Sequence, residues 1–146
     1  MSFQFPLATV LRYRESIEQR EYLALETIQQ DIVRVEQRIA QVEHDSSVAL
    51  QKRMADLARG TRAAVVQSEY ECEGVLEREI ERLRGLMQEL KAKWRRQLAA
   101  YELARRNRET LEKLRQKQLD AYTQEQAKRE QAVVDDLFLA RRWRSN

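Results

Sequence analysis

Side chains that could do acid–base, nucleophilic or metal chemistry are few and isolated in this sequence. The sole histidine, His44, lies between Glu43 and Asp45, and the sole cysteine, Cys72, lies between two glutamates. A histidine can bind a metal or transfer a proton, but a single one beside two acidic residues on a helix surface is favoured to be solvated. The glutamates flanking Cys72 disfavour its reactive thiolate. Neither residue predicts a catalytic or metal site.

The carboxylates and glycines also give no indication of a catalytic or phosphate-binding site. The acidic residues occupy what the pattern indicates is a solvated helical face, rather than a pocket that would tune their pKa values for acid–base catalysis. There is no glycine-rich phosphate loop and no paired-cysteine metal motif. We therefore predict that the protein is not an enzyme and uses no cofactor or metal.

The composition indicates which elements must carry any function. The chain has 146 residues, of which 35% are charged, with 3 Gly and 1 Pro. Turns draw on Gly, Pro, Asn and Asp, so this composition favours long helices in a coiled coil. The net charge of +3 comes from 27 basic and 24 acidic residues. Because the two signs are interleaved rather than clustered, we expect no nucleic-acid binding.

Three features bear on location. Cys72 has no disulfide partner within the chain, which favours a reducing compartment. The first residues lack the pattern of a signal peptide, and no run approaches the ~20 apolar residues of a membrane span. We expect a soluble, cytoplasmic protein.

Apolar residues at heptad spacing predict two helices with narrow seams. Pro6 suits the first position of a helix. The first seam comprises Val10, Ile17, Ala24, Leu25, Ile28, Ile32, Val35, Ile39 and Val42, with Leu50, Met54 and Leu57 continuing it after a shift of phase. The second comprises Leu76, Ile80, Leu83, Met87, Leu90, Trp94, Tyr101 and Ala104, interrupted by Gln97 and followed by Arg108 and Arg115 in the same register. Packing is the favoured role of Trp94 and Tyr101, with anchoring of another protein as the alternative.

The preferred break between the helices is Gly60, followed by Thr61 as a cap, with Gly74 as the alternative. The predicted fold is all-α, with two long helices in an antiparallel coiled-coil hairpin whose C-terminal helix overhangs. A single domain over residues 1–146 would have helices at about 6–58 and 64–141 and a turn at about 59–63. Folding back there would set Phe5 opposite residue 117 and leave the region after about 120 unpaired.

That unpaired region carries an apolar cluster at Val133, Val134, Leu137, Phe138 and Leu139, followed by "ARRWRSN". Together with Phe3 and Phe5 it predicts an apolar and basic end that binds a partner. Arg and Trp are enriched at binding hot spots, so docking of "ARRWRSN" is weighed evenly against a frayed tail.

Three stretches resemble the FliJ family. "FQFPLATVLRYRESIEQREYLAL" is similar to the start of that family, with its Phe-x-Phe and Leu-x-x-Arg. "YELARRNRETLEKLRQKQ" and "REQAVVDDLFLARR" are similar to its C-terminal helix. The resemblance covers almost the whole chain and implies an antiparallel coiled coil of the flagellar type III export apparatus, similar to the central stalks of rotary ATPases.

The resemblance also implies partners, namely the hexameric flagellar export ATPase, the export gate protein FlhA and export chaperones. The protein would associate with the cytoplasmic face of the inner membrane only through these partners. The residues then expected to dock on the ATPase are Phe3, Phe5, Leu7, Leu137, Phe138, Arg141, Arg142 and Trp143. Val42, Cys72 and Leu76 lie in the stretch that the family uses toward the gate, although Cys72 stands where an aromatic residue is expected.

Three alternative functions are retained. One is the equivalent stalk of a virulence type III secretion system, which genomic neighbourhood would distinguish. Another is a homodimeric coiled-coil scaffold, whose overhang would pair with itself. A third is nucleic-acid binding, which would weaken steeply with salt.

Overall fold

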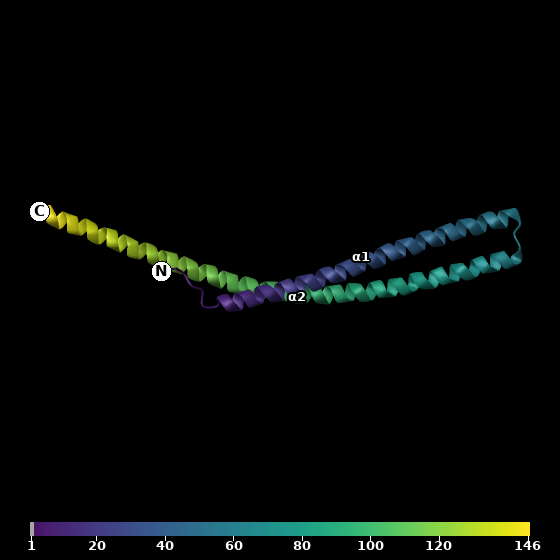
Figure 1. The fold of residues 1–146 in the computed structure, drawn as a ribbon, viewed down its shortest axis with the longest axis horizontal. Coiled ribbons are helices and arrows are strands. Elements are labelled where there is room, and N and C mark those ends of the chain that lie inside the picture. The colour runs from purple at the N-terminus through teal and green to yellow at the C-terminus, as the bar shows by residue number, and fades with distance from the viewer. Residues whose placement is uncertain (1) are drawn as a thin grey trace. The chain divides into compact units, whose positions relative to one another are not determined.

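The computed structural model describes residues 2–146 and contains two long helices, α1 (Ala8–Arg59) and α2 (Ala63–Arg144). The helices pack against each other as an antiparallel hairpin, which confirms the predicted all-α fold (Figure 1). Packing divides the hairpin into two units. The turn unit is Glu21–Tyr101, and the terminal unit comprises residues 2–20 together with Glu102–Asn146.

The turn lies at Gly60, and backbone hydrogen bonds explain why α1 stops there. Gly60 has a φ of 78°, in the left-handed region that suits glycine. Its N–H donates to the carbonyl of Leu57 at 3.3 Å, and the N–H of Thr61 donates to the carbonyl of Asp56 at 3.2 Å. These two bonds form a Schellman motif. Thr61 therefore closes α1 with its backbone, and its expected side-chain cap on α2 does not form among residues 2–146.

The core of the turn unit follows the predicted heptad seams. Ile28, Ile32 and Met87 are its buried centre, and the residues packed against them are Val35, Ile39, Leu90 and Trp94. Farther toward the turn, Val42 and Leu83 are 1% and 3% exposed. The ring of Tyr101 lies 5.8 Å from that of Tyr22 in a tilted arrangement. Trp94 and Tyr101 thus take part in packing within the hairpin.

Near the turn, the predicted phase of the first seam is wrong. The expected seam residues Leu50, Met54 and Leu57 are 42%, 63% and 53% exposed. The inward positions instead continue the spacing of Ile39 and Val42 without a shift, through Ser46, Ala49, Arg53 and Asp56. A shift of phase would require local unwinding or overwinding of the coiled coil. The helix keeps its phase, so polar residues enter the seam and apolar ones face outward.

Polar contacts across the hairpin fill that part of the seam. The guanidinium of Arg53 on α1 forms an ion pair with Glu73 on α2 and lies 4.4 Å from the ring centroid of Tyr70. The Arg53 and Glu73 side chains are only 15% and 26% exposed. Charge-assisted hydrogen bonds and cation–π contacts of this kind are worth more where water is partly excluded. They hold the helices together where the apolar seam is absent.

In the terminal unit, α1 buries a different residue from the one predicted. Leu11 is 8% exposed and Ala104 is 5% exposed, whereas the expected seam residue Val10 is 41% exposed. Helix α1 begins at Ala8, so Pro6 lies in the turn before the helix rather than at its first position. The N–H of Ala8 donates to the carbonyl of Phe5 at 3.1 Å, which closes this turn.

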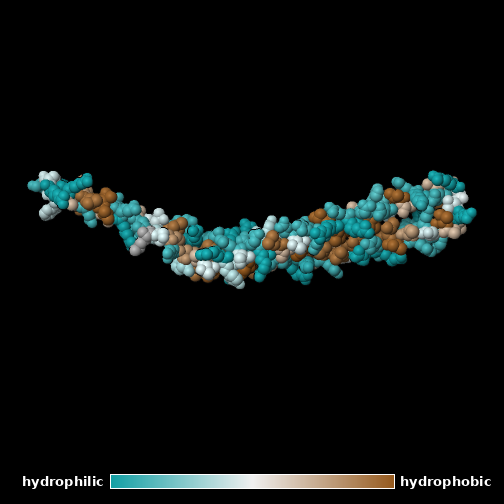
Figure 2. All heavy atoms as spheres, viewed as in Figure 1, coloured by the Kyte–Doolittle hydropathy of each residue, from teal (hydrophilic) through white to brown (hydrophobic). Residues whose placement is uncertain are grey.

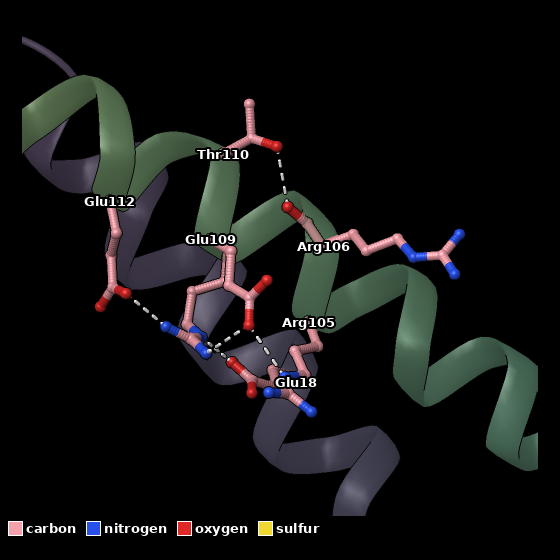
Figure 3. A network of polar contacts seen from close by, with 7 residues as sticks. Glu18, Arg105, Arg106, Glu109, Thr110 and Glu112 are labelled. Atoms are coloured by element: carbon pink, nitrogen blue, oxygen red, sulfur yellow. Dashed lines mark hydrogen bonds and ion pairs between the residues drawn. The ribbon is translucent and has the colours of Figure 1, made fainter.

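Of the three polar residues in the register of the α2 seam, Gln97 and Arg108 are paired across the hairpin, whereas Arg115 is exposed. In the turn unit, the Gln97 amide donates to the backbone carbonyl of Glu21 at 3.0 Å. In the terminal unit, Arg108 pairs with Glu18 on α1 and with Glu112 on its own helix. Arg105 adds a contact to Glu109 at 2.9 Å (Figure 3). Polar residues therefore maintain the pairing at positions where the sequence indicates that it weakens.

Candidate functional site

The first candidate surface is the overhang, which we define as residues 123–144 of α2. Its apolar side chains are uncovered, because Leu137, Phe138 and Trp143 are 58%, 65% and 85% exposed. Figure 2 shows apolar atoms gathered on this part of α2. Val133, Val134 and Leu139 are also more than half exposed. Large exposed apolar patches of this kind mark interaction sites in soluble proteins.

Basic side chains adjoin this apolar surface. Arg141, Arg142 and Arg144 form the last turn of α2, where positive charge is favourable beside the carbonyl ends of a helix. Ser145 donates its N–H to the carbonyl of Arg141 at 3.2 Å, which extends the helical pattern past Arg144. The segment "ARRWRSN" is thus helical up to Arg144, and its Trp143 stands in solvent.

Phe3 and Phe5, which are expected at the same site, are less exposed to solvent than the apolar side chains of the overhang. Phe5 is buried, and Phe3 packs its ring 5.6 Å from that of Tyr122 on α2 in a tilted arrangement. Leu7 is 37% exposed. The structure thus brings Phe3 onto the flank of α2 at Tyr122, three residues past position 119, which is the level that residue 117 opposite Phe5 implies for Phe3.

The residues expected to face the export gate fall into two adjacent grooves of the turn unit. Val42 and Leu76 line one groove together with Val75 and charged side chains from both helices. Val42 is buried and Leu76 is half-buried, so Val75, which is 57% exposed, is the accessible apolar residue there. The charged residues of this groove are Arg38, Asp45, Arg78, Glu79 and Arg82.

Charges within this groove are already paired in part. Arg82 bonds Glu79 through two nitrogens, at 2.8 and 3.0 Å. This contact lowers the pKa of the Glu79 carboxyl and raises the pKa of the Arg82 guanidinium. The charge of Arg38 also lowers the pKa of Glu79. Arg78 forms no ion pair among residues 2–146 and adds positive charge to the groove.

Cys72 lines the second groove, which is closer to the turn. The thiol is exposed, and its neighbours there include Glu69, Lys52 and Val65. Both carboxyl oxygens of Glu69 are buried and lack a hydrogen-bond donor among residues 2–146. The Asp56 carboxylate on α1 raises the pKa of Glu69, and loss of hydration raises it further, while Lys52 and Arg53 act in the opposite direction.

Leu50, Met54 and Leu57 form an outward stripe that their sequence pattern does not predict. Their apolar character and their spacing by four and three predict a place in the seam. The signal that could have revealed their exposure is the unbroken spacing of Ser46, Ala49, Arg53 and Asp56 after Val42. Val65, Tyr70 and Val75 on α2 are further exposed apolar residues of the turn unit.

Metal sites and membrane-spanning helices are two other classes of feature to consider in the described residues. Within residues 2–146, no three acidic, histidine or cysteine side chains come together as a metal site would require. Neither described helix combines the length and apolar character needed to cross a membrane.

The fold and its surfaces define a class of protein, a two-helix antiparallel coiled coil with an uncovered apolar and basic overhang. The model of a family described as "Flagellar FliJ protein" matches residues 3–146. The chain therefore belongs to the FliJ family, and it is a component of the flagellar export apparatus, in a family known as non-catalytic. Searches of curated proteins and of solved structures found no match.

Proposed function

We propose that this protein is the central-stalk-like subunit of the flagellar export apparatus. It binds the hexameric export ATPase through the overhang, promotes assembly of the ATPase ring, and links the ring to the export gate protein FlhA through the turn unit. It acts by binding rather than by catalysis. It reaches the cytoplasmic face of the inner membrane through these partners, and export chaperones are further partners.

The observation that carries this proposal is the overhang itself. A helix that leaves Leu137, Phe138 and Trp143 largely in solvent gains little from packing within its own chain. Aromatic and arginine side chains at one place are typical of binding hot spots. A single rod of this kind can contact six ATPase subunits only unequally. Contacts that favour one ring conformation would promote assembly through binding energy.

The gate contact is proposed for the groove that holds Val75 and Leu76. Val42 supports its floor, because its side chain is buried. Cys72 lies in the adjacent groove and would contact the same partner at its edge. The exposed guanidinium groups of Arg38 and Arg78 favour an acidic partner surface, since charge complementarity mainly increases the association rate.

The test measures ATP hydrolysis and ring content of the matching flagellar export ATPase with the full chain and with a double variant, Leu137→Asp and Phe138→Asp. We expect the full chain to raise both quantities and the double variant to leave them at the level of the ATPase alone, because a buried carboxylate is costly in an apolar contact. Binding of the FlhA cytoplasmic domain is measured in parallel with Val75→Asp. We expect that variant to weaken gate binding while the ATPase response stays intact.

Matched controls separate these contacts from general damage. Leu103→Asp changes a leucine of α2 that is 60% exposed, against 58% for Leu137, and lies outside the overhang. Val48→Asp is the corresponding control for Val75, at 50% exposure. Equal loss of ATPase stimulation by Leu103→Asp and the double variant would contradict docking through the overhang. An unchanged ATPase with the full chain would contradict the stalk function altogether.

A further inference from the structure

The overhang carries charges that match a second copy of itself. Successive residues of an α-helix are rotated by about 100°. Positions 127, 130, 134, 137, 141 and 144 therefore lie on one face, with spacings that alternate between three and four. This face holds Val134 and Leu137 at its centre, Glu130 on one side and Arg141 on the other. Val133 and Phe138 flank the centre.

Three charged residues lie on this face, and two of them, Glu130 and Arg141, adjoin the apolar centre, while Arg144 lies at the end, where an antiparallel copy would place Ala127 opposite it. Neither Glu130 nor Arg141 forms a side-chain hydrogen bond or ion pair within residues 2–146. By contrast, two other acidic residues of the overhang have partners, since Glu125 contacts Arg129 at 3.6 Å and Asp135 accepts from Gln131 at 2.9 Å. Glu130 and Arg141 lie on opposite sides of the apolar centre, so an antiparallel second copy would set each of them opposite a residue of the other charge.

We infer that two copies of this chain pair through their overhangs in antiparallel orientation, with Val134 of each copy opposite Leu137 of the other. This register sets Glu130 of each copy opposite Arg141 of the other, and Val133 opposite Phe138. A parallel pair would instead place Glu130 against Glu130 and Arg141 against Arg141. A shift by one heptad in either direction would place Val134 or Leu137 opposite a charged residue. Charge and apolar pattern therefore select one arrangement.

The contact is small, so the dimer is weak. The contact covers four apolar side chains on each copy. The area that it buries is therefore smaller than the roughly 1,200–2,000 Å² that stable interfaces bury in total. Leu139, Asp136 and Trp143 point away from this face by helical rotation and stay uncovered. The dimer therefore forms at high local concentration and dissociates on dilution.

Regulation of ATPase docking follows if the proposed function holds, and this step rests on it. The dimer covers Leu137, Phe138 and Arg141, which the ATPase would also contact. Pairing would then keep the overhang protected until the ATPase displaces the second copy. The dimer itself needs no ATPase, so the two proposals are tested separately.

Sedimentation equilibrium of the full chain, from low micromolar to near-millimolar concentration, measures the pairing. We expect concentration-dependent dimerisation that Glu130→Arg weakens by about tenfold or more, because it replaces attraction with repulsion at two symmetric places. Arg141→Glu should do the same, and the double variant with both changes should restore the wild-type dimer. Asp136→Arg is the matched control, an equal change of charge outside the seam, and should leave dimerisation unchanged.

Disulfide crosslinking tests the orientation in a Cys72→Ser background. Chains with Ala127→Cys and chains with Arg144→Cys are mixed, and the antiparallel register predicts the mixed disulfide over either homodimer. A predominant link between two copies of the Ala127→Cys chain would overturn the antiparallel arrangement. A wild-type chain that stays monomeric up to near-millimolar concentration, or a double charge variant that fails to recover pairing, would overturn the interface.

Discussion

At the scale of residues, polar side chains in the seam explain how the hairpin stays paired where apolar residues are missing. Arg108 is only 21% exposed, and its contact with Glu18 raises the pKa of its guanidinium, despite an opposing effect of lost hydration. Figure 3 shows Glu18 on one helix meeting residues of the other, with Arg105 and Glu109 beside it. Each such pair also discriminates between registers, since a shifted helix would leave a partly buried charge without its partner.

Asp56 and Glu69 carry like charges, unlike the ion pairs described above, and their contact predicts a pH effect on stability. The pKa of Glu69 is raised from its ordinary value of 4.5 in the folded state, so protonation favours folding. The stabilisation is fully present below that ordinary pKa and is lost as the pH rises through the folded-state pKa. We expect Glu69→Gln to raise the Tm at neutral pH, and the difference from wild type to shrink on acidification toward pH 4.5.

Thermal unfolding followed by circular dichroism across this pH range measures the effect. Glu71→Gln is the matched control, because it removes one carboxylate from an exposed position of the same helix. The electrostatic account fails if Glu69→Gln lowers the Tm at neutral pH, or if its effect grows as the pH falls.

At the scale of elements, the three glycines have different roles. Gly60 terminates α1 with a positive φ that L side chains rarely adopt. Gly85 lies inside α2 with open space around its missing Cβ, and Gly74 lies inside α2 beside the Arg78 side chain. A glycine in the interior of a helix is unfavourable because it loses the most conformational freedom on folding.

The environments of Gly85 and Gly60 predict opposite effects of a glycine-to-alanine substitution on stability. Gly85→Ala should raise the free energy of unfolding by about 0.5–1 kcal/mol, because alanine has the higher helix propensity and meets no atom there. Gly60→Ala should lower it by about 1 kcal/mol or more, because the positive φ is strained for alanine. Urea unfolding of both variants measures the difference. Equal effects of the two substitutions would contradict the Schellman turn at Gly60.

At the scale of the molecule, both helices run without a break from one unit into the other. Helix α1 crosses from Arg20 to Glu21, and α2 crosses from Tyr101 to Glu102. Each unit has buried residues of its own, such as Leu11 in the terminal unit and Ile32 in the turn unit. We propose that residues 1–146 nevertheless unfold as a single coiled-coil domain, because separating the units would require two helices to break at once.

Native-state hydrogen exchange under increasing denaturant tests this proposal. Amides near Leu11 and Ala104 should exchange with the same limiting free energy as amides near Ile32 and Met87, since one cooperative opening exposes them all. Amides of the overhang should exchange far faster, because no packing protects them. Opening of the terminal unit at clearly lower denaturant concentration would divide the chain into two domains.

The sequence by itself determined the helical hairpin, its turn and its unpaired end. Heptad spacing is a local signal, and Gly60 and the overhang cluster are visible without any knowledge of packing. Only the tertiary structure decided which face turns inward near the turn, where Arg53 and Asp56 displace Met54 and Leu57 from the seam. The physical reason is that Ile39 and Val42 already fix which face of α1 turns inward. A change of that face would require the helix to unwind or overwind locally, and a few apolar residues do not cause this.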